Sequence, residues 1–335
     1  MRAIVYSETG GQDVLRLVDR PTPEPGPGEV RVRMRVSGVN PTDWKARRGG
    51  QVAFPEQVPN QDGSGTIDAV GEGVDPARVG DRVWLWEAAW QRADGTAQEY
   101  VALPSRQAVR MPDDTSFDLG ASLGVPALTA HRCLTVSEFG PSRLRPRALA
   151  GRVVLVAGAG AVGHAAIQLT RWAGGRPLAT VSSEEKAALA RAAGAELTFD
   201  YRREDAGEEI LRAAPTGVDI VVEVAPAANA ELDAAVLAPN GAVATYATEG
   251  GPEVTLPIRD LMGRNVRYQF VLLYTVARAA KEAAVEDVSA ALAEGALPVG
   301  PEAGLPLHRF PLERAADAHA AVEKGAVGKV LIDVA

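Results

Sequence analysis

A buried strand that runs directly into a glycine-rich turn constrains this chain more than any other stretch of its sequence. Residues 153–157 read Val-Val-Leu-Val-Ala, residues 158–163 read Gly-Ala-Gly-Ala-Val-Gly, and an Ala-rich segment with helical spacing follows at 164–174. In such a Gly-x-Gly-x-x-Gly loop the first glycine permits a tight turn, the second lets a pyrophosphate approach the backbone, and the third lets the helix pack against the strand. The helix N-terminus offers N–H groups to the phosphates. The segment therefore predicts a dinucleotide site.

The position of this loop near the middle of a chain of 335 residues predicts two domains. Residues 1–105 contain many short strand-like segments separated by turns, such as the alternating 31–36, and predict a small all-β barrel. From residue 151 strands and helices alternate, which is typical of a parallel, doubly wound sheet. The tail, 305–335, is too short for a domain and is expected to pack back on the barrel. The expected strands of the second half are 153–157, 177–181, 196–199, 218–224, 241–246 and 266–274, and the expected helices are 161–174, 184–193, 205–213, 228–237 and 276–294.

Composition narrows the possible partners. A net charge of −8 argues against a nucleic-acid or anionic-membrane surface, because such surfaces need clustered Lys and Arg. No apolar run approaches the ~18 residues of a membrane-spanning helix, and the N-terminus lacks the apolar region of a signal peptide. The single cysteine, Cys133, excludes an intramolecular disulfide and is expected to be an inert buried residue. We therefore expect a soluble, cytoplasmic protein without nucleic-acid or membrane partners.

A series of short motifs runs along the chain. In order they are Met1 to Ile4, Gly11 to Leu15, Pro25 to Val30, Gly38 to Pro41, Gly71 to Val74, Gly80 to Val83, the glycine loop, Gly194-Ala195 and Gly328 to Leu331. Together they resemble the motifs of the medium-chain dehydrogenase/reductase superfamily, and within it the chain is most similar to the zinc-free quinone oxidoreductases of the zeta-crystallin type. The resemblance implies an α/β fold. A GroES-like β-barrel catalytic domain would comprise residues 1–125 and 274–335, and a Rossmann cofactor domain with a doubly wound parallel sheet would comprise 126–273.

The resemblance to the zinc-free branch depends on missing metal ligands. Zinc-dependent relatives place a Cys where this chain has Asn40, and His-Glu where it has Gln61-Asp62. Four closely spaced cysteines, needed for a structural zinc, are absent from the sequence, and its four histidines lack ligand spacing. We expect no metal. Without a Lewis acid, hydride addition to an electron-poor acceptor is favoured over alcohol oxidation.

The end of the second strand predicts the type of nicotinamide cofactor. NAD sites usually carry an Asp or Glu about 20 residues after the glycine loop, and here Ser182 and Ser183 stand at that place. Small hydroxyls together with Lys186 suit a 2′-phosphate, so we predict NADPH. The alternative is structural, since Ser182 and Glu185 have the spacing of a helix capping box.

Further cofactor positions follow partly from the loop and partly from the resemblance. Thr129 has an alternative role in bonding its own helix backbone, and the segment 266–273 is also a candidate dimer edge. The glycine loop is one residue shorter than in relatives, which predicts a tighter turn. The full set of predicted cofactor residues is Thr129, Gly158, Gly160, Ala161, Val162, Gly163, Ser182, Ser183, Lys186, Tyr201, Asn229, Ala247, Thr248, Phe270, Val271 and Leu272.

The candidates for the acceptor side come from two short stretches. Asn40, Asp43 and Lys45 are the catalytic candidates, Asn40 as a hydrogen-bond donor to a ribose hydroxyl or acceptor carbonyl and Lys45 as a cation for a developing oxyanion. A surface lysine is the alternative for Lys45. The candidate acceptor-binding residues are Trp44, Gln61, Trp84 and Trp86. The two tryptophans of 84–86 form either an aromatic wall for a planar acceptor or part of the barrel core.

These observations predict an NADPH-dependent, zinc-free reductase of quinones or similar conjugated carbonyls, forming a homodimer. Two alternatives stay open. One is a 2-enoyl thioester reductase of the same superfamily. The other is a non-enzymatic, crystallin-like NADPH-binding or RNA-binding protein, and the acidic charge argues against the binding of RNA.

Overall fold

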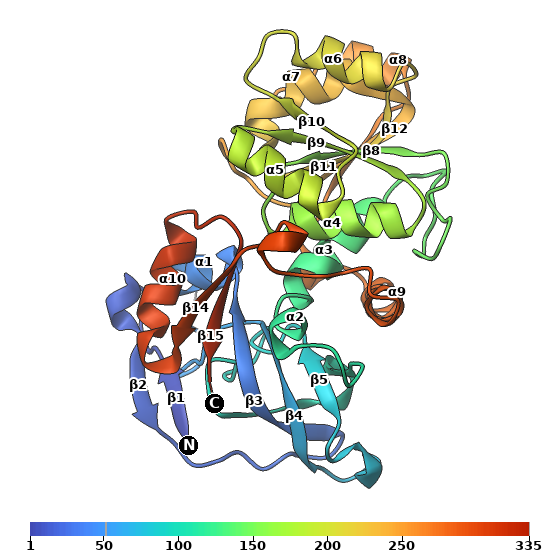
Figure 1. Cartoon of the computed structure of the whole chain (residues 1–335). Helices are drawn as coiled ribbons and strands as arrows, with labels where there is room; N and C mark the ends of the chain where they lie inside the picture. The colour runs from blue at the N-terminus through green and yellow to red at the C-terminus, as the bar shows by residue number, and fades with distance from the viewer. Residues whose placement is uncertain (51, 335) are drawn as a thin grey trace. The chain divides into compact units, whose positions relative to one another are not determined.

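The computed structural model describes residues 1–50 and 52–334 and divides the chain into two compact units (Figure 1). The first unit comprises Met1–Val125 and Pro306–Ala335, and the second comprises Pro126–Leu305. Residues 274–305, which were predicted to belong to the catalytic domain, lie in the second unit. In the described residues no helix is both long and apolar enough to span a membrane.

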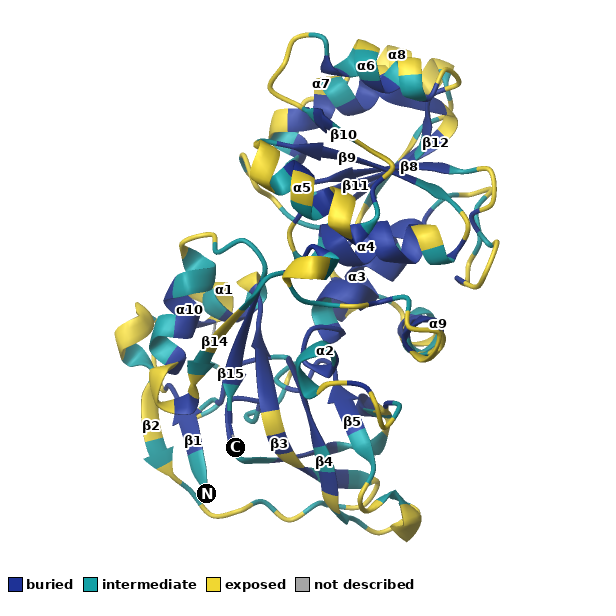
Figure 2. Ribbon diagram, in the orientation of Figure 1, coloured by how far each residue is buried: buried dark blue, intermediate teal, exposed yellow. Residues whose placement is uncertain are grey.

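The first unit is built mainly from antiparallel strands. The predicted alternation of buried and exposed side chains along 31–36 is confirmed in this unit. Val32, Met34 and Val36 are buried and Arg33 and Arg35 are exposed, and Figure 2 colours the strands of the unit by burial. Within the described residues, one sheet has the order β14 (Leu307–Pro311), β15 (Lys329–Asp333), β3 (Glu29–Val39), β4 (Asp62–Val70), β5 (Arg82–Leu85) and β7 (Ala108–Arg110), with β6 (Tyr100–Pro104) also paired to β3, and a second sheet pairs β1 (Arg2–Val5) with β2 (Arg16–Asp19). The helices are α1 (Pro41–Gly49), α2 (Phe117–Gly120) and α10 (Ala315–Glu323).

The tail joins this sheet through β15, which pairs antiparallel to β3 with Leu331 opposite Gly38. Strand β14 pairs parallel to β15 on its other side. The buried residues Val330 and Ile332 extend the apolar core formed by β3, so the last strand completes the interior of the first unit.

The second unit contains a parallel sheet with helices on both faces. Figure 1 shows α4 and α5 on one face and α6 and α7 on the other, as the alternating pattern predicted. Within the described residues the strand order is β10 (Leu197–Asp200), β9 (Arg176–Val181), β8 (Val153–Ala157), β11 (Val218–Glu223), β12 (Leu237–Thr245) and β13 (Arg267–Phe270). The helices are α3 (Gly124–Leu134), whose first turn contains the boundary between the units, α4 (Ala161–Trp172), α5 (Glu184–Ala193), α6 (Ala206–Ala213), α7 (Pro226–Val236), α8 (Ile258–Gly263) and α9 (Arg278–Ala293).

One predicted element is shorter than expected. The strand predicted over 266–274 is formed only at β13, Arg267–Phe270, because the chain turns into a short 3₁₀ helix at Leu273–Thr275. Phe270 and Leu272 are largely exposed, whereas Val271 is buried. The apolar run 270–274 therefore ends the sheet instead of extending it.

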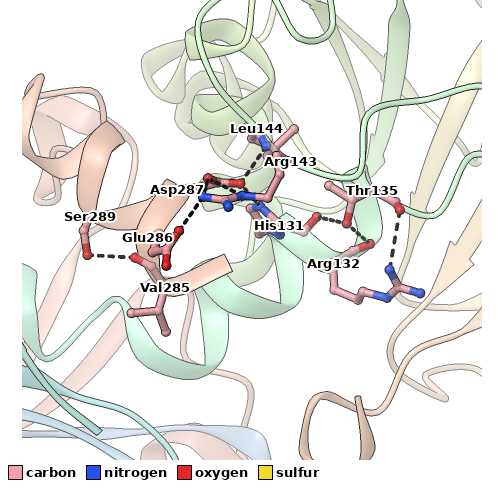
Figure 3. A network of polar contacts seen from close by, with 9 residues as sticks. All are labelled: His131, Arg132, Thr135, Arg143, Leu144, Val285, Glu286, Asp287 and Ser289. Atoms are coloured by element: carbon pink, nitrogen blue, oxygen red, sulfur yellow. Dashed lines mark hydrogen bonds and ion pairs between the residues drawn. The ribbon is translucent and has the colours of Figure 1, made fainter. Parts of the chain in front are cut away.

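A buried carboxylate explains why α9 belongs to the second unit (Figure 3). Asp287 of α9 accepts hydrogen bonds from His131 Nε2 at 2.8 Å, from Arg143 Nε at 2.8 Å and from the Leu144 N–H at 2.7 Å. Burial alone would raise the pKa of Asp287, but the hydrogen bonds from His131 and Arg143 outweigh it and hold that pKa below its usual value. The ionised side chain thus ties α9 to α3 and to the loop before β8.

Replacing this carboxylate tests its structural role. We expect Asp287→Ala to lower the free energy of unfolding by about 3 kcal/mol, because it leaves buried donors without an acceptor. The adjacent Glu286 also pairs with Arg143 but is exposed, so Glu286→Ala is the matched control and should change stability by less than about 0.5 kcal/mol. Urea denaturation of the two variants measures the difference, and equal effects would contradict the assigned role.

Candidate functional site

The glycine loop after β8 has a separate geometric requirement at each of its three glycines. Gly158 has φ +85°, in the left-handed region that favours glycine. A Cβ at Gly163 would lie 2.2 Å from the Gly158 carbonyl oxygen, so only glycine lets α4 begin this close to the strand. Gly160 precedes the first residue of α4, and a Cβ there would meet no atom within 4 Å. The open side of the loop at Gly160 can therefore receive a phosphate next to the helix N-terminus.

The end of β9 places a hydroxyl beside a cation. Lys186 Nζ donates to Ser182 Oγ at 3.2 Å, and the backbone N–H of Lys186 donates to Ser183 Oγ at 3.2 Å. Ser183 is thus the N-cap of α5, and the alternative that Ser182 caps this helix is wrong. Ser182 and Lys186 form a small polar, positively charged spot after β9, and the exposed Tyr201 follows the neighbouring strand β10.

The turn between β11 and α7 is held by a buried acidic side chain. Glu223 accepts hydrogen bonds from Asn229 Nδ2 at 3.0 Å and from the Ala225 N–H. Burial raises the pKa of Glu223, and burial together with the neighbouring Glu223 raises that of Asp233 well above its usual value. Both carboxyl groups are therefore harder to ionise than they would be in water. The side-chain amide of Asn229, a predicted cofactor residue, has a fixed orientation because its Nδ2 donates to Glu223.

Parallel strand pairing brings most of the predicted cofactor segments to one edge of the sheet. The carboxyl ends of β9, β8, β11, β12 and β13 lie side by side in that order, which is where open α/β sheets bind their ligands. Thr129 is buried in α3, Ala247 is half-buried, and Thr248 is exposed. The segments at this edge are 158–163, 182–186, 225–229, 247–248 and 270–272.

In the first unit, a second group of polar side chains is almost completely buried. We call Asn40, Asp43, Asp62 and Lys329 the polar cluster; their exposed fractions are 2%, 4%, 0% and 1%. Asn40 Nδ2 donates to Asp62 Oδ2 at 2.7 Å, and Lys329 Nζ donates to Asn40 Oδ1 at 2.7 Å and to Asp62 Oδ2 at 3.4 Å. The Asn40 amide, predicted to bond the ribose or the acceptor carbonyl, is instead bonded on both sides within the protein.

The two carboxyl groups of the cluster serve helix N-termini. Asp43 Oδ2 accepts the Asn40 N–H at 2.7 Å where α1 begins, and Asp62 Oδ1 accepts the Val125 N–H at 2.8 Å near the start of α3. Burial, with the nearby Asp62, raises the pKa of Asp43 to about 8, so this carboxyl is protonated at neutral pH. Asp62 faces the amine of Lys329; burial raises the pKa of Asp62 and lowers that of Lys329, and the attraction between the two groups opposes both shifts.

The remaining acceptor-side candidates are dispersed. Lys45 is exposed, with its ammonium 5.7 Å from the centre of the Trp44 ring. Gln61 Oε1 accepts the Ala89 N–H at 3.1 Å. Trp84 and Trp86 are 0% and 4% exposed, which places them in the interior of the first unit and argues against an aromatic wall.

Two members of the cluster, Asp62 and Lys329, are absent from the site residues predicted from the sequence. Asp62 appears there only in place of a zinc ligand, and Lys329 appears only within the motif Gly328 to Leu331. One signal was available, because Lys329 directly precedes the apolar run Val330-Leu331-Ile332 in a tail that was expected to pack on the barrel. A lysine at such a place needs an acidic or carbonyl partner inside the protein.

Comparisons with known proteins agree with this architecture. Residues 26–113 match the family model "Alcohol dehydrogenase GroES-like domain", and residues 161–290 match "Zinc-binding dehydrogenase". A quinone oxidoreductase from Lama guanicoe is 32% identical over 99% of this chain and 97% of its own length. Among solved structures, an NAD-dependent alcohol dehydrogenase has a TM-score of 0.86 at 30% identity and covers both chains completely. A mycobacterial protein complexed with NADPH has a TM-score of 0.81 at 32% identity, covering 99% of this chain and 100% of its own.

The raised pKa of Asp43 predicts a specific pH dependence of stability. Its folded-state pKa, about 8, lies above the ordinary value of 3.8 expected when unfolded. The contribution of the Asp43 side chain to the free energy of unfolding is therefore fully present below about pH 4, where Asp43 is protonated in both states. It is lost as the pH rises toward 8, because only the unfolded state then ionises freely. We expect Asp43→Asn, which cannot ionise, to remove this loss, so that wild type weakens relative to the variant between pH 5 and pH 8.

Urea denaturation at pH 5, 6.5 and 8 measures this difference. The exposed Asp19 of the same unit provides the control variant Asp19→Asn, which should keep the wild-type pH dependence. If the free energy of unfolding varied with pH in the same way for wild type and Asp43→Asn, Asp43 would have to ionise in the folded protein below pH 5, contrary to the assignment.

Proposed function

Because this chain belongs to the quinone oxidoreductase branch of the medium-chain dehydrogenase/reductase superfamily, we propose that it reduces a quinone or a similar conjugated carbonyl with NADPH and without zinc. The observation that carries the proposal is the glycine loop after β8, open at Gly160 and followed by the Ser182–Lys186 spot. Full-length similarity to quinone oxidoreductases supports the acceptor class. When bound, NADPH supplies the hydride from its nicotinamide ring.

The polar cluster supports the zinc-independent part of the proposal. Zinc sites use Cys, His and carboxylate ligands in a tetrahedral arrangement, whereas the oxygens here are Asn40 Oδ1 and Asp62 Oδ2, and both are bonded to the ammonium of Lys329. A divalent cation at this point would meet a positive charge. The donor set therefore does not fit a zinc ion, although one matching family model is named for zinc binding.

NADPH is favoured over NADH by the side chains after β9. A 2′-phosphate needs hydrogen-bond donors and positive charge, and Ser182 with Lys186 supplies both. The mycobacterial relative complexed with NADPH adds support from a protein of the same length and fold. The exposed Tyr201, next in order along this edge, is our candidate for contact with the adenine ring.

The first unit supplies candidate groups for the acceptor. Lys45 is exposed and stands beside Trp44, so its ammonium is our candidate for stabilising negative charge on the acceptor oxygen. Asn40 and Asp43 are buried and hydrogen-bonded within the polar cluster, so we propose that they position the start of α1 and do not contact the acceptor. Trp84 and Trp86 are buried in the core of the first unit, so we do not propose them as acceptor contacts.

We also propose a homodimer whose contact includes the edge of the parallel sheet at β13. Phe270 and Leu272 at this edge are more than half exposed, as are Ile258 and Met262 of α8. Large apolar side chains gathered in this way are typical of protein contacts.

Acceptor specificity tests the proposed reaction. We expect the protein to oxidise NADPH with 1,4-benzoquinone or 9,10-phenanthrenequinone and to be much slower with crotonyl-CoA, which represents the enoyl thioester alternative. Absorbance at the NADPH maximum measures the three reactions in parallel. Turnover with the thioester alone would overturn the quinone proposal, and NADPH binding without turnover of any acceptor would favour the non-enzymatic alternative.

Cofactor preference is tested at the end of β9. We expect Ser182→Asp to weaken NADPH binding at least tenfold and to favour NADH, because a carboxylate repels the 2′-phosphate and accepts hydrogen bonds from ribose hydroxyls. Titration of both cofactors by fluorescence measures the dissociation constants. Glu185→Asp on the same helix is the control, and an unchanged NADPH preference in Ser182→Asp would remove Ser182 from the cofactor site.

A further inference from the structure

Lys329 is a lysine whose ammonium is enclosed within the first unit. The side chain leaves β15 next to β3, where Gly38 lies opposite Leu331. A Cβ at Gly38 would lie 3.1 Å from Lys329 Cε and 3.2 Å from Lys329 Nζ. The absence of a side chain at Gly38 therefore leaves the space through which the ammonium reaches Asn40 and Asp62.

The amine of Lys329 is the single cationic group of the polar cluster, which also contains the carboxyl groups of Asp43 and Asp62, all buried. Lys329 Nζ lies 3.4 Å from Asp62 Oδ2, so the ammonium is placed to compensate the charge of this carboxylate. Removing the ammonium alone would leave a buried carboxylate uncompensated, which is strongly unfavourable.

We propose that the Lys329 ammonium is a built-in cation, which occupies the place that a divalent metal ion would need in this cluster. One side chain then does two things. It neutralises Asp62 and fixes the orientation of the Asn40 amide, and it keeps metal ions out by charge repulsion. This inference rests on the zinc-independent part of the proposed function and does not depend on the identity of the acceptor.

The surrounding oxygens explain why a cation is needed at this point. Asp62 Oδ2 and Asn40 Oδ1 both point to the ammonium, at 3.4 Å and 2.7 Å. Asp43 Oδ1 is buried and has no hydrogen-bond partner among the described residues. Carboxylate and amide oxygens are the ligands that hard divalent cations such as Mn²⁺ prefer. Without Lys329 the cluster would therefore be a metal site built from oxygen donors.

Mn²⁺ binding to variants tests this role. We expect wild type to bind no stoichiometric Mn²⁺ and Lys329→Ala to bind about one equivalent. The affinity of the variant for Mn²⁺ should exceed any weak binding by wild type at least about tenfold, and added Mn²⁺ should raise the thermal midpoint of the variant. Electron paramagnetic resonance of free Mn²⁺ measures the binding without any turnover, so a failed quinone assay leaves this result unaffected. Lys324→Ala, an exposed lysine of the same segment, is the control and should behave as wild type.

Two further variants separate charge from packing. Lys329→Arg keeps the positive charge and should still exclude Mn²⁺, whereas Lys329→Ala combined with Asp62→Asn should lose the acquired binding. If Lys329→Ala binds no Mn²⁺ while folded, or if wild type binds one equivalent that Asp62→Asn abolishes, the proposal is overturned.

A stability measurement covers the case in which Lys329→Ala does not fold. Lys329→Met should be less stable than the double variant Lys329→Met with Asp62→Asn, because the second change removes the uncompensated carboxylate. Rescue by Asp62→Asn supports the counter-ion role. A double variant that is no more stable than Lys329→Met would overturn it, since the lysine would then act through packing alone.

Discussion

The first unit depends on the ion pair between Asp62 and Lys329. Asp62 accepts hydrogen bonds from the start of α3 and from Asn40, which directly precedes α1, while Lys329 belongs to the last strand of the chain. Segments far apart in the sequence are thus held by one carboxylate. Burying two charges is costly, and the cost is offset only when every donor and acceptor has a partner. The position of α1, with its exposed Lys45 and half-buried Trp44, therefore depends on an interaction that is itself enclosed in the protein.

The second unit uses buried acidic groups in a similar way, but to hold loops. Asp287 connects α9 to His131 and Arg143, and Glu223 fixes the turn that precedes α7. In contrast, the glycine loop is held by close backbone packing at Gly163, and a Cβ at Gly160 would meet no atom within 4 Å. The buried carboxyl groups thus fix the loops around the sheet edge, while the open side of the glycine loop is the proposed binding surface.

Sequence-based prediction was accurate where a feature depends on residues close together in the sequence, and it failed where the feature depends on contacts between distant residues. The β8 strand, the roles of Gly158 and Gly163 and the alternation of strands and helices depend on local geometry, and they were predicted within a few residues. The assignment of 274–305 failed because α9 is held by contacts between Asp287 and residues about 150 positions away. Asn40 was predicted to be a ligand-binding amide. The prediction missed its hydrogen bond with Lys329, because the two residues are 289 positions apart in the sequence. Spacing along the chain carries no information on such pairs, and the same applies to the burial of Trp84 and Trp86.

The polar cluster also limits how the site could acquire a metal. Its geometry requires small residues as well as charged ones, because a Cβ at Gly124 would lie 2.0 Å from Asp62 Oδ1 and a Cβ at Gly38 would crowd Lys329. Exchanging Asn40 for a thiolate alone would place a further negative group beside Asp62 while the ammonium still occupied the cation position. The added negative charge would be attracted to the ammonium of Lys329. In the role that we propose for Lys329, this lysine must therefore change together with Asn40 before a metal ion can bind at this point.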